Sequence, residues 1–501
     1  MRLIEYRSPV ATSRMKGRDC QSVTTRSLAH RLISILTTII IAATLTAAET
    51  RPHYGGTLRV MLRSAPDTLA LPLNAAPADY WDLARTLSLI GDTLVTLDAQ
   101  GHPQPALATA WQTDASAQHW QFTLRRGVRF QDGSVASPEA IAQILGAIHS
   151  NWMIRTTPDS LTIELPTPSP SLLAELALPR NLLLKRDKNG TPVGTGPFLV
   201  SEWQPGRMLK LVANEESWKG RPFVNAVNIE FGKSLRDQAI ALELDRTDIV
   251  EVEPQISNSS QRDVSSVSLP VELLALVFPA NSKARDPRLR EALALAIDRK
   301  PIQSVLLKGA GEPAAGVLPN WMTGYSAVFS APANAVRARA LLADSRPPAL
   351  NLSYDPRDPQ AQLIAERIAL NAHEIGVNIQ VSLSGPEDVR LVRVALPSPD
   401  PFMSLVEAAR QMELPDPTST AGSSTMSASL SVEDLYQVER SVLERYAVIP
   451  LFHLPVVTAA GARVHGWEPG RLGDWNSAAT SSENTIANIW LTESHSGAGP
   501  K

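Results

Sequence analysis

Two glutamates, Glu251 and Glu253, are the side chains of this sequence best placed to recognise charge. They lie in the run Thr-Asp-Ile-Val-Glu-Val-Glu-Pro at residues 247–254. If this run is extended, both carboxylates share a face with Ile249, because side chains alternate along a strand. Two carboxylates in a partly dry site repel each other unless a cation, an amine or a basic side chain lies between them. The pair predicts either a site that reads positive charge on a ligand or a solvated strand face, and both interpretations stay open.

Histidine offers the alternative of a metal site. His453 lies in the apolar run at residues 450–455, a setting typical of a hydrogen-bonded core histidine rather than a metal ligand. His373 is followed by Glu374 but by no second histidine four residues further on, so the helical zinc-protease motif is absent. No cluster of cysteine and histidine occurs. We therefore expect neither a metal ion nor another cofactor.

Catalytic signatures are also missing from the sequence. There is no Gly-x-Ser-x-Gly nucleophile turn and no phosphate-binding loop of the Gly-x-x-x-x-Gly-Lys-Ser/Thr kind. Because catalytic residues can be dispersed along a chain, this is the absence of a signal. The expectation is a protein that is not an enzyme.

The composition indicates a globular protein with more than one core. The chain has 501 residues, of which 44% are hydrophobic and 5% aromatic, and this length exceeds the usual size of a single core. A formal net charge of -3 gives no general attraction to nucleic acid or to anionic membranes. We expect two or more packed lobes and no nucleic-acid partner.

The N-terminal region has the layout of an export signal. An uncharged run from Leu32 to Thr46 follows a stretch rich in arginine and precedes small residues, so residues 1–48 are predicted to be a signal peptide. An uncleaved membrane anchor is the alternative, but the run is shorter than the about 20 residues that span a bilayer. The only cysteine, Cys20, lies within this leader and has charged neighbours. A lipid anchor is therefore not expected, and the location is predicted to be periplasmic or extracytoplasmic.

Strands and helices are interleaved after the leader. Residues 120–124 and 161–165 alternate as strands do, and a hairpin is predicted from 120 to 130, closed by turns at Gly127 and Gly133. Helices are predicted after Ser137-Pro138, over 286–299 and over 360–374, the last followed by Gly376 and a strand at 377–381. The fold class is mixed α/β.

Taken in order, several motifs resemble the bacterial extracellular solute-binding proteins that serve oligopeptide, dipeptide and nickel ABC importers. They are Gly55 to Leu58, Pro105 to Trp111, Trp120 to Gly133, Gly194 to Phe198, Asn214, Trp218 to Pro222, Asp286 to Arg299, Gly309 and Pro319. The resemblance implies a two-lobed periplasmic-binding-protein-like fold (type II, cluster C-like) with a hinge and a cleft. Lobe I would comprise residues 49–268 and 458–501, and lobe II residues 269–457.

The resemblance also implies a function. Such a protein captures a peptide or similar small solute by closing its lobes, and delivers it as a monomer to the permease subunits of an ABC importer. Residues 247–254 match the crossover segment that lines the cleft, and Pro399-Asp400-Pro401 matches an element at the cleft, which makes Asp400 a third candidate ligand contact. In peptide binders an aspartate three residues earlier pairs with the ligand ammonium group, whereas this chain has Pro397.

The missing aspartate puts recognition of a free peptide N-terminus in doubt. Two alternatives therefore stay open: a bilobal sensor or interaction protein that is not coupled to transport, and a binder of a nickel chelate or another non-peptide solute.

Overall fold

The structure is a computed structural model. It describes residues 51–71, 79–253, 264–325, 332–358, 360–384, 387–417, 431–467, 470–473, 475 and 486–492. The chain divides into two units, Met1–Pro52 and His53–Lys501, and the fold below is that of the second unit. The predicted signal peptide at 1–48, with Cys20, lies outside the described residues. No helix in the described ranges is long and apolar enough to cross a membrane.

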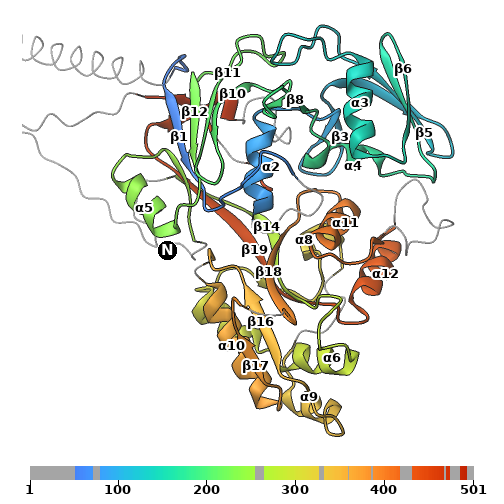
Figure 1. The fold of residues 1–501 in the computed structure, drawn as a ribbon, viewed down its shortest axis with the longest axis vertical. Helices are drawn as coiled ribbons and strands as arrows, with labels where there is room; N and C mark the ends of the chain where they lie inside the picture. Colours follow the sequence, from blue (N-terminus) through green and yellow to red (C-terminus); the bar gives the residue numbers. More distant parts are fainter. Residues whose placement is uncertain are drawn as a thin grey trace, which may run out of the picture. The chain divides into compact units, whose positions relative to one another are not determined.

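One large mixed sheet runs through the second unit (Figure 1). Its strands follow the order β10 (Phe198–Gln204), β11 (Met208–Ala213), β12 (Ala226–Glu230), β1 (Thr57–Met61), β13 (Ile249–Glu251), β19 (Val448–Ala460), β14 (Val264–Val277), β18 (Val389–Ala395), β16 (Leu350–Tyr354) and β17 (Ile379–Val381), and β15 (Glu312–Pro313) pairs with β19. We call the side of β1 and β10–β13 the first part, and the side of β16–β18 the second part.

Two long antiparallel strands, β14 and β19, join these parts. At one end β19 pairs with β13, where Glu251 lies opposite Thr458. At the other end β14 pairs with β18 over residues 272–277. Along this pair, the register of β14 against β19 shifts between Val267 and Pro270, between Pro270 and Glu272, and once more between Leu274 and Ala275. The ladder is thus interrupted where the chain passes from one part to the other.

A smaller sheet extends the first part. It has the order β4 (Ala108–Thr113), β5 (His119–Leu124), β7 (Ser160–Glu164) and β6 (Met153–Thr157), beside helix α3 (Pro138–Ile148). Ser137 caps α3 as predicted, since its hydroxyl accepts the backbone N–H of Ala140. The predicted hairpin is wrong: β5 pairs with β4 and β7, and the following segment forms only one isolated bridge, between Arg129 and Val135.

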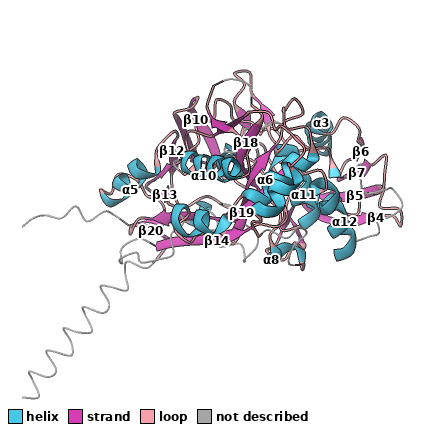
Figure 2. Ribbon diagram, turned by 90° about the horizontal axis from the view of Figure 1, so that it is seen from below, coloured by secondary structure: helices cyan, strands magenta, loops and turns pink. Residues whose placement is uncertain are grey.

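Helices cover the sheet of the second part. The predicted helix over 286–299 is α6 (Pro287–Ala296), which Asp286 caps, followed by the short α7 (Arg299–Pro301). The predicted sequence of helix, Gly376 and strand is confirmed as α10 (Ala361–Glu374) and β17. Helix α10 packs on β16 and β17, α11 (Pro401–Gln411) on β18 and α12 (Val432–Leu443) on β19, and α6 contacts α10. Figure 2 labels these four helices.

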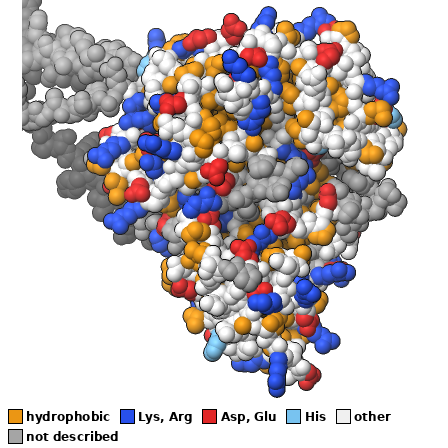
Figure 3. All heavy atoms as spheres, viewed as in Figure 1, with side chains coloured by type: hydrophobic (Ala, Val, Ile, Leu, Met, Phe, Trp, Pro, Cys, Tyr) orange, Lys and Arg blue, Asp and Glu red, His pale blue; other side chains and the backbone are white. Residues whose placement is uncertain are grey.

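The shorter elements mostly connect these layers. They are β2 (Val95–Leu97), β3 (Pro103–Pro105), α4 (Leu172–Leu176), β8 (Lys185–Arg186), β9 (Pro192–Val193), α5 (Leu235–Glu243), α8 (Asn320–Thr323), α9 (Ala335–Leu341), β20 (Val464–His465) and β21 (Trp490–Leu491). On the face drawn in Figure 3, basic and acidic side chains are interspersed, in keeping with the small net charge.

Each part has its own core. Leu58, Phe198 and Leu209 are buried in the first part, and Leu274 and Ile364 are buried in the second. The prediction that Phe130 and Phe198 are core residues rather than ligand contacts is confirmed, because both are fully buried. A third buried cluster joins the parts, since Ala174 and Leu178 of the first pack with Phe402 and Leu405 of the second.

Candidate ligand-binding site

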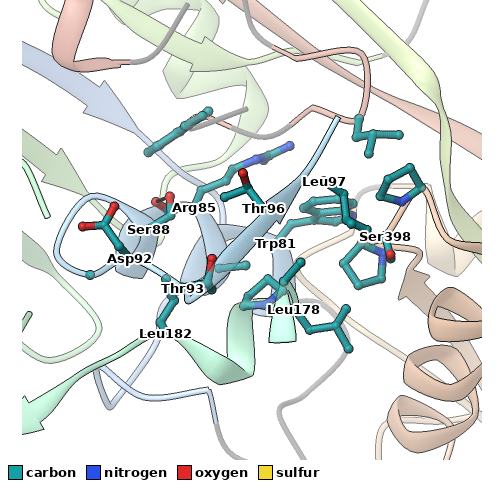
Figure 4. A pocket seen from close by; sticks show the side chains of 18 of the residues that line it. Trp81, Arg85, Ser88, Asp92, Thr93, Thr96, Leu97, Leu178, Leu182 and Ser398 are labelled. Atoms are coloured by element: carbon teal, nitrogen blue, oxygen red, sulfur yellow. Dashed lines mark hydrogen bonds between the residues drawn. The ribbon is translucent and has the colours of Figure 1, made fainter. Parts of the chain in front are cut away.

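A cavity of about 970 Å³, partly open to solvent, lies where the two parts meet (Figure 4). The first part contributes helix α2 (Tyr80–Ser88), residues 91–93, 96–98 and 177–179, Leu182 and Lys219. The second part contributes residues 397–399, which precede α11. Leu472 and Trp475 complete the wall.

Helix α2 presents one face to the cavity. Trp81, Ala84, Arg85 and Ser88 line it, and their spacing of three and four residues places them on one side of a helix. Arg85 was not among the predicted site residues, because the local sequence does not show that its charged side chain is buried.

Arg85 is the most buried charged side chain of the cavity wall, with 2% exposure. Its Nε donates to the carbonyl oxygen of Gly473 at 2.8 Å. Its guanidinium carbon lies 5.3 Å from the ring centre of Trp81 and 5.9 Å from that of Trp475. The guanidinium therefore lies near two indole rings, a favourable setting for a cation.

Asp82 is the nearest carboxylate to Arg85, but it compensates the charge poorly. The distance from Arg85 Nη1 to Asp82 Oδ1 is 3.5 Å, at the limit of a hydrogen bond. Burial, followed by repulsion from Glu251, raises the pKa of Asp82 to about 7. Burial and Glu251 thus disfavour the charged form of Asp82, and its contact with Arg85 is long.

Asp92, in the loop that follows α2, differs from Asp82 because its carboxylate has several close partners. Its carboxylate accepts hydrogen bonds from Thr195 Oγ1 at 2.8 Å and Trp218 Nε1 at 2.9 Å, and pairs with Lys219 Nζ at 2.7 Å. Burial alone would raise the pKa of Asp92, but Lys219 and these hydrogen bonds outweigh it and lower the pKa. The Asp92 carboxylate is therefore fully paired within the protein, and its contacts hold this part of the cavity wall in place.

Several segments that are distant in sequence hold this loop. The Gln131 side chain donates to the carbonyl oxygens of Ile90 at 2.9 Å and Phe198 at 2.6 Å, and accepts the N–H of Gly194 at 3.1 Å. Gly196 donates its N–H to Ile90 at 2.9 Å. The motifs that carried the family resemblance thus converge on residues 89–92, directly behind the cavity.

The wall from the second part contains Pro397, Ser398 and Pro399. The resemblance placed the element Pro399-Asp400-Pro401 at the cleft, and Pro399 does lie in the cavity wall. Asp400 is not among the lining residues, and its carboxylate caps α11 by accepting the N–H of Met403 at 2.8 Å. Burial raises the pKa of Asp400.

The cap gives a direct test of the role of Asp400. We expect Asp400→Ala to lower the free energy of unfolding by about 1 kcal/mol, because the N–H of Met403 loses its acceptor, while Asp400→Asn keeps most of it. Urea unfolding measures both variants. If Asp400→Asn keeps this stability but weakens ligand binding, Asp400 is a ligand contact as well as a cap.

The two walls of the cavity are also linked by a buried ion pair. Arg180, which follows the 177–179 segment of the first part, pairs with Glu407 on α11 and with Glu175. Both Arg180 and Glu407 have nearly inaccessible side chains. Because breaking one partner of a buried pair leaves the other charge uncompensated, this contact favours the arrangement in which the two walls meet.

Glu251 and Glu253 do lie together, as their spacing predicted, but they line a different and smaller pocket of about 450 Å³. Glu251 accepts the backbone N–H of Arg63 at 2.7 Å, and Glu253 pairs with Lys308 Nζ at 2.8 Å. The basic partner that a carboxylate pair requires is therefore supplied within the protein for Glu253. Ile249 is in the core of the first part and not in this pocket.

His453 is a core histidine, as predicted. It has 4% exposure on β19, and its Nε2 lies 3.0 Å from the carbonyl oxygen of Val317. Within the described ranges no group of three or more histidine, cysteine or carboxylate side chains is arranged to hold a metal ion.

Known proteins resemble this chain in sequence and in fold. Residues 102–393 match the family described as bacterial extracellular solute-binding proteins, family 5 middle. The probable D,D-dipeptide-binding periplasmic protein DdpA of Escherichia coli (strain K12) is 24% identical over 308 residues, which are 55% of this chain and 60% of that protein. The nickel-binding periplasmic protein of the same organism is 25% identical over 381 residues, 65% of this chain and 72% of that protein.

A solved structure extends the likeness to nearly the whole fold. The ABC transporter-associated periplasmic binding protein DppA from Helicobacter pylori, in complex with peptide STSA, matches with a TM-score of 0.72 and 18% identity, over 88% of this chain and 99% of that one. The predicted fold class is confirmed: this is the two-lobed, mixed α/β fold of periplasmic binding proteins. The sequence match spans 60% of the first curated relative, so what the whole protein binds is a matter of inference.

Proposed function

This chain belongs to family 5 of the bacterial extracellular solute-binding proteins, and we propose that it captures a peptide or similar small solute and delivers it to the permease subunits of an ABC importer. One observation carries the proposal: the cavity of about 970 Å³ has walls from both parts of the two-lobed fold. Closing the lobes on a ligand would complete this cavity, and a transporter could then recognise the closed form.

We propose the lobe boundaries that the sequence suggested. Lobe I comprises residues 49–268 and 458–501, and lobe II residues 269–457. The register shifts of β14 between Val267 and Glu272 support a hinge at this place, because an interrupted ladder bends more readily than a continuous one. Each proposed lobe contains a core of its own, and a third buried cluster, which includes Leu178 and Phe402, lies where the lobes meet.

The remaining parts of the proposal concern location and chemistry. We propose that residues 1–48 direct export to the periplasm or another extracytoplasmic site, without a lipid anchor, and that the protein acts as a monomer. We also propose that it is not an enzyme, since its family consists of binding proteins and its sequence lacks catalytic motifs.

Lobe closure can be measured directly. Cys20 is the only cysteine, so a Cys20→Ser background allows one fluorophore at Ala110→Cys on β4 and one at Leu363→Cys on α10, both exposed positions in different lobes. We expect a bound solute to raise energy transfer and to stabilise the protein by about 2.7 kcal/mol at 100 times its Kd. Dipeptides, tripeptides and nickel with histidine are the first probes. Binding without any change in energy transfer would contradict closure as the mechanism.

We keep Glu251, Glu253 and Asp400 as proposed ligand contacts. The same titration with Glu251→Gln and Glu253→Gln tests the first two: a loss of about tenfold in affinity supports direct contact with a cationic group. Unchanged affinity would assign these carboxylates to the internal contacts with Arg63 and Lys308 alone.

A further inference from the structure

Four side chains of alternating charge form a row across the boundary between the two proposed lobes. Glu175 on α4 and Arg180 belong to lobe I, and Glu407 and Arg410 lie on α11 in lobe II. Arg180 donates Nε to Glu175 Oε1 at 2.9 Å, contacts Glu175 Oε2 through Nη2, and donates Nη1 to Glu407 Oε2. Arg410 Nη1 lies 3.8 Å from Glu407 Oε2. Of these contacts, only the one between Arg180 and Glu407 joins the lobes.

The contact that joins the lobes is shielded from water. The side chains of Arg180 and Glu407 have 7% and 5% exposure. Each residue lies two positions after a member of the buried apolar cluster that spans the boundary, Leu178 in lobe I and Leu405 in lobe II. Charges interact more strongly in such surroundings than in water. This ion pair should therefore favour closure more than a solvent-exposed pair would.

The lobe I half of the row is a neutral pair by itself. Burial would raise the pKa of Glu175, but Arg180 and a hydrogen bond from Asn181 at 3.1 Å outweigh it and lower the pKa, so Glu175 is charged. His149 Nε2 lies 3.6 Å from Glu175 Oε1. Burial lowers the pKa of His149, so its imidazole adds no charge near neutral pH. Arg180 thus has an anionic partner in its own lobe.

The lobe II half is arranged in the same way. Glu407 and Arg410 are three residues apart on α11, a spacing that makes their side chains neighbours on a helix. Arg410 is 29% exposed, so its side chain can turn without displacing a packed core. A rotamer change would bring its guanidinium from 3.8 Å to full contact with Glu407. Glu407 thus also has a cationic partner in its own lobe.

From this arrangement we propose that Glu407 exchanges partners when the lobes move, and that this exchange sets the fraction of closed molecules. In the closed protein Glu407 binds Arg180. In the open protein the row separates into two neutral pairs, Glu175 with Arg180 and Glu407 with Arg410. Opening then leaves no charge uncompensated, so the row favours closure without preventing release. This inference rests on the proposed function and names the residues that regulate it independently of the solute.

Two substitutions with opposite expected effects test the exchange. The Cys20→Ser protein labelled at Ala110→Cys and Leu363→Cys is freed of solute by unfolding and refolding, and single-molecule energy transfer gives the ratio of closed to open molecules. Glu407→Gln should lower this ratio at least about tenfold, because the charged contact between lobes is lost. Arg410→Gln should raise it about three- to tenfold, because Glu407 then has a charged partner only in the closed state.

Affinity gives a second measurement. A change in the closed fraction alone weakens the binding of every solute by one common factor. Calorimetry with L-leucyl-L-leucine and with nickel plus histidine should therefore show equal losses for Glu407→Gln. Glu439→Gln is the matched control, because Glu439 is a buried glutamate whose carboxylate accepts from Tyr325 and Leu318 within lobe II. It should leave the closed fraction and both affinities unchanged.

A cross-linking rate covers the case in which one state holds nearly all molecules. Asp79 and Arg357 form another ion pair between the lobes, at 2.8 Å. A short cysteine-reactive linker should join Asp79→Cys to Arg357→Cys, in the Cys20→Ser background, at a rate proportional to the closed fraction. The expected order is Arg410→Gln fastest, then the unsubstituted row, then Glu407→Gln. Arg410→Gln alters a partly exposed side chain and carries the test if Glu407→Gln does not fold.

The outcomes separate this inference from the proposed function. Unchanged ratios, shifts of both variants in the same direction, or unequal losses for the two solutes would overturn the exchange of partners. If a solute still raised energy transfer in the protein with the natural row, the proposed function would stand. If that protein showed a single state with every solute, both would fail.

Discussion

Replacing Gly194 by alanine is expected to destabilise the protein by at least about 3 kcal/mol and to prevent ligand binding under conditions where the wild type is folded. A Cβ at this position would lie 2.2 Å from the carbonyl oxygen of Ile90 and 2.8 Å from the Cα of Gly91. These are backbone atoms, so no side-chain rotation relieves the overlap. The loop that carries Asp92 would have to move away, and with it the wall of the cavity.

Gly146→Ala is the control for this prediction. Gly146 lies inside α3, and a Cβ there meets nothing within 4 Å. Alanine is the better helix former, so this variant should be stabilised by up to about 1 kcal/mol. Urea unfolding compares the two substitutions in the same protein. A Gly194→Ala variant of wild-type stability would mean that the 194–198 segment does not press on residues 89–91, and the account of the wall would be wrong.

The glycine motif illustrates what local sequence could and could not predict. Gly194 to Phe198 was recognisable as part of a family pattern, but by itself it resembles an ordinary turn. Its role depends on contacts with Ile90 and Gln131, more than 60 residues away along the chain. Such close contacts depend on the tertiary structure. The local sequence does not predict them, and only the order of the family motifs indicated that this glycine segment matters.

Elements set by short-range chemistry were predicted well. Ser137-Pro138 and Asp286-Pro287 both start helices, because a side-chain cap and a proline at the first helical position act within one turn. The hairpin after Trp120 failed for the opposite reason. Its strand pairs with β7, about 40 residues further on, and no local pattern specifies that partner.

The candidate site was predicted only in part. The pairing of Glu251 with Glu253 followed from strand alternation, but Lys308, which neutralises Glu253, comes from the other proposed lobe. Arg85 was missed because nothing in its neighbours shows that its guanidinium will be buried beside a cavity. Charge compensation between distant residues, such as Glu253 and Lys308, is decided by the fold.

His453 gives the second large effect, an acid-sensitive loss of stability. Burial lowers the pKa of His453 from 6.5 to about 4, only partly offset by the hydrogen bond to Val317. Above pH 6.5 the imidazole is neutral in both states, and its contribution to stability is complete. As the pH falls from 6.5 to 4, the unfolded chain takes up a proton that the folded protein does not. The free energy of unfolding should therefore drop by about 3 kcal/mol over this range because of His453.

Titration of Asp82 changes stability with pH in the opposite direction to that of His453. The effect of His453 is therefore taken from the stability difference between wild type and a variant. Its pKa is raised to about 7 from 3.8, hence its contribution to stability is present at low pH and is lost as the pH rises. Unfolding of wild type and His453→Gln should be compared from pH 4 to 7. The stability difference should change by about 3 kcal/mol in favour of the variant as the pH falls, whereas His373→Gln, at an exposed site on α10, should follow the wild type. A difference that stayed constant with pH would mean that His453 is protonated in the folded protein, and that the core around β19 admits charge.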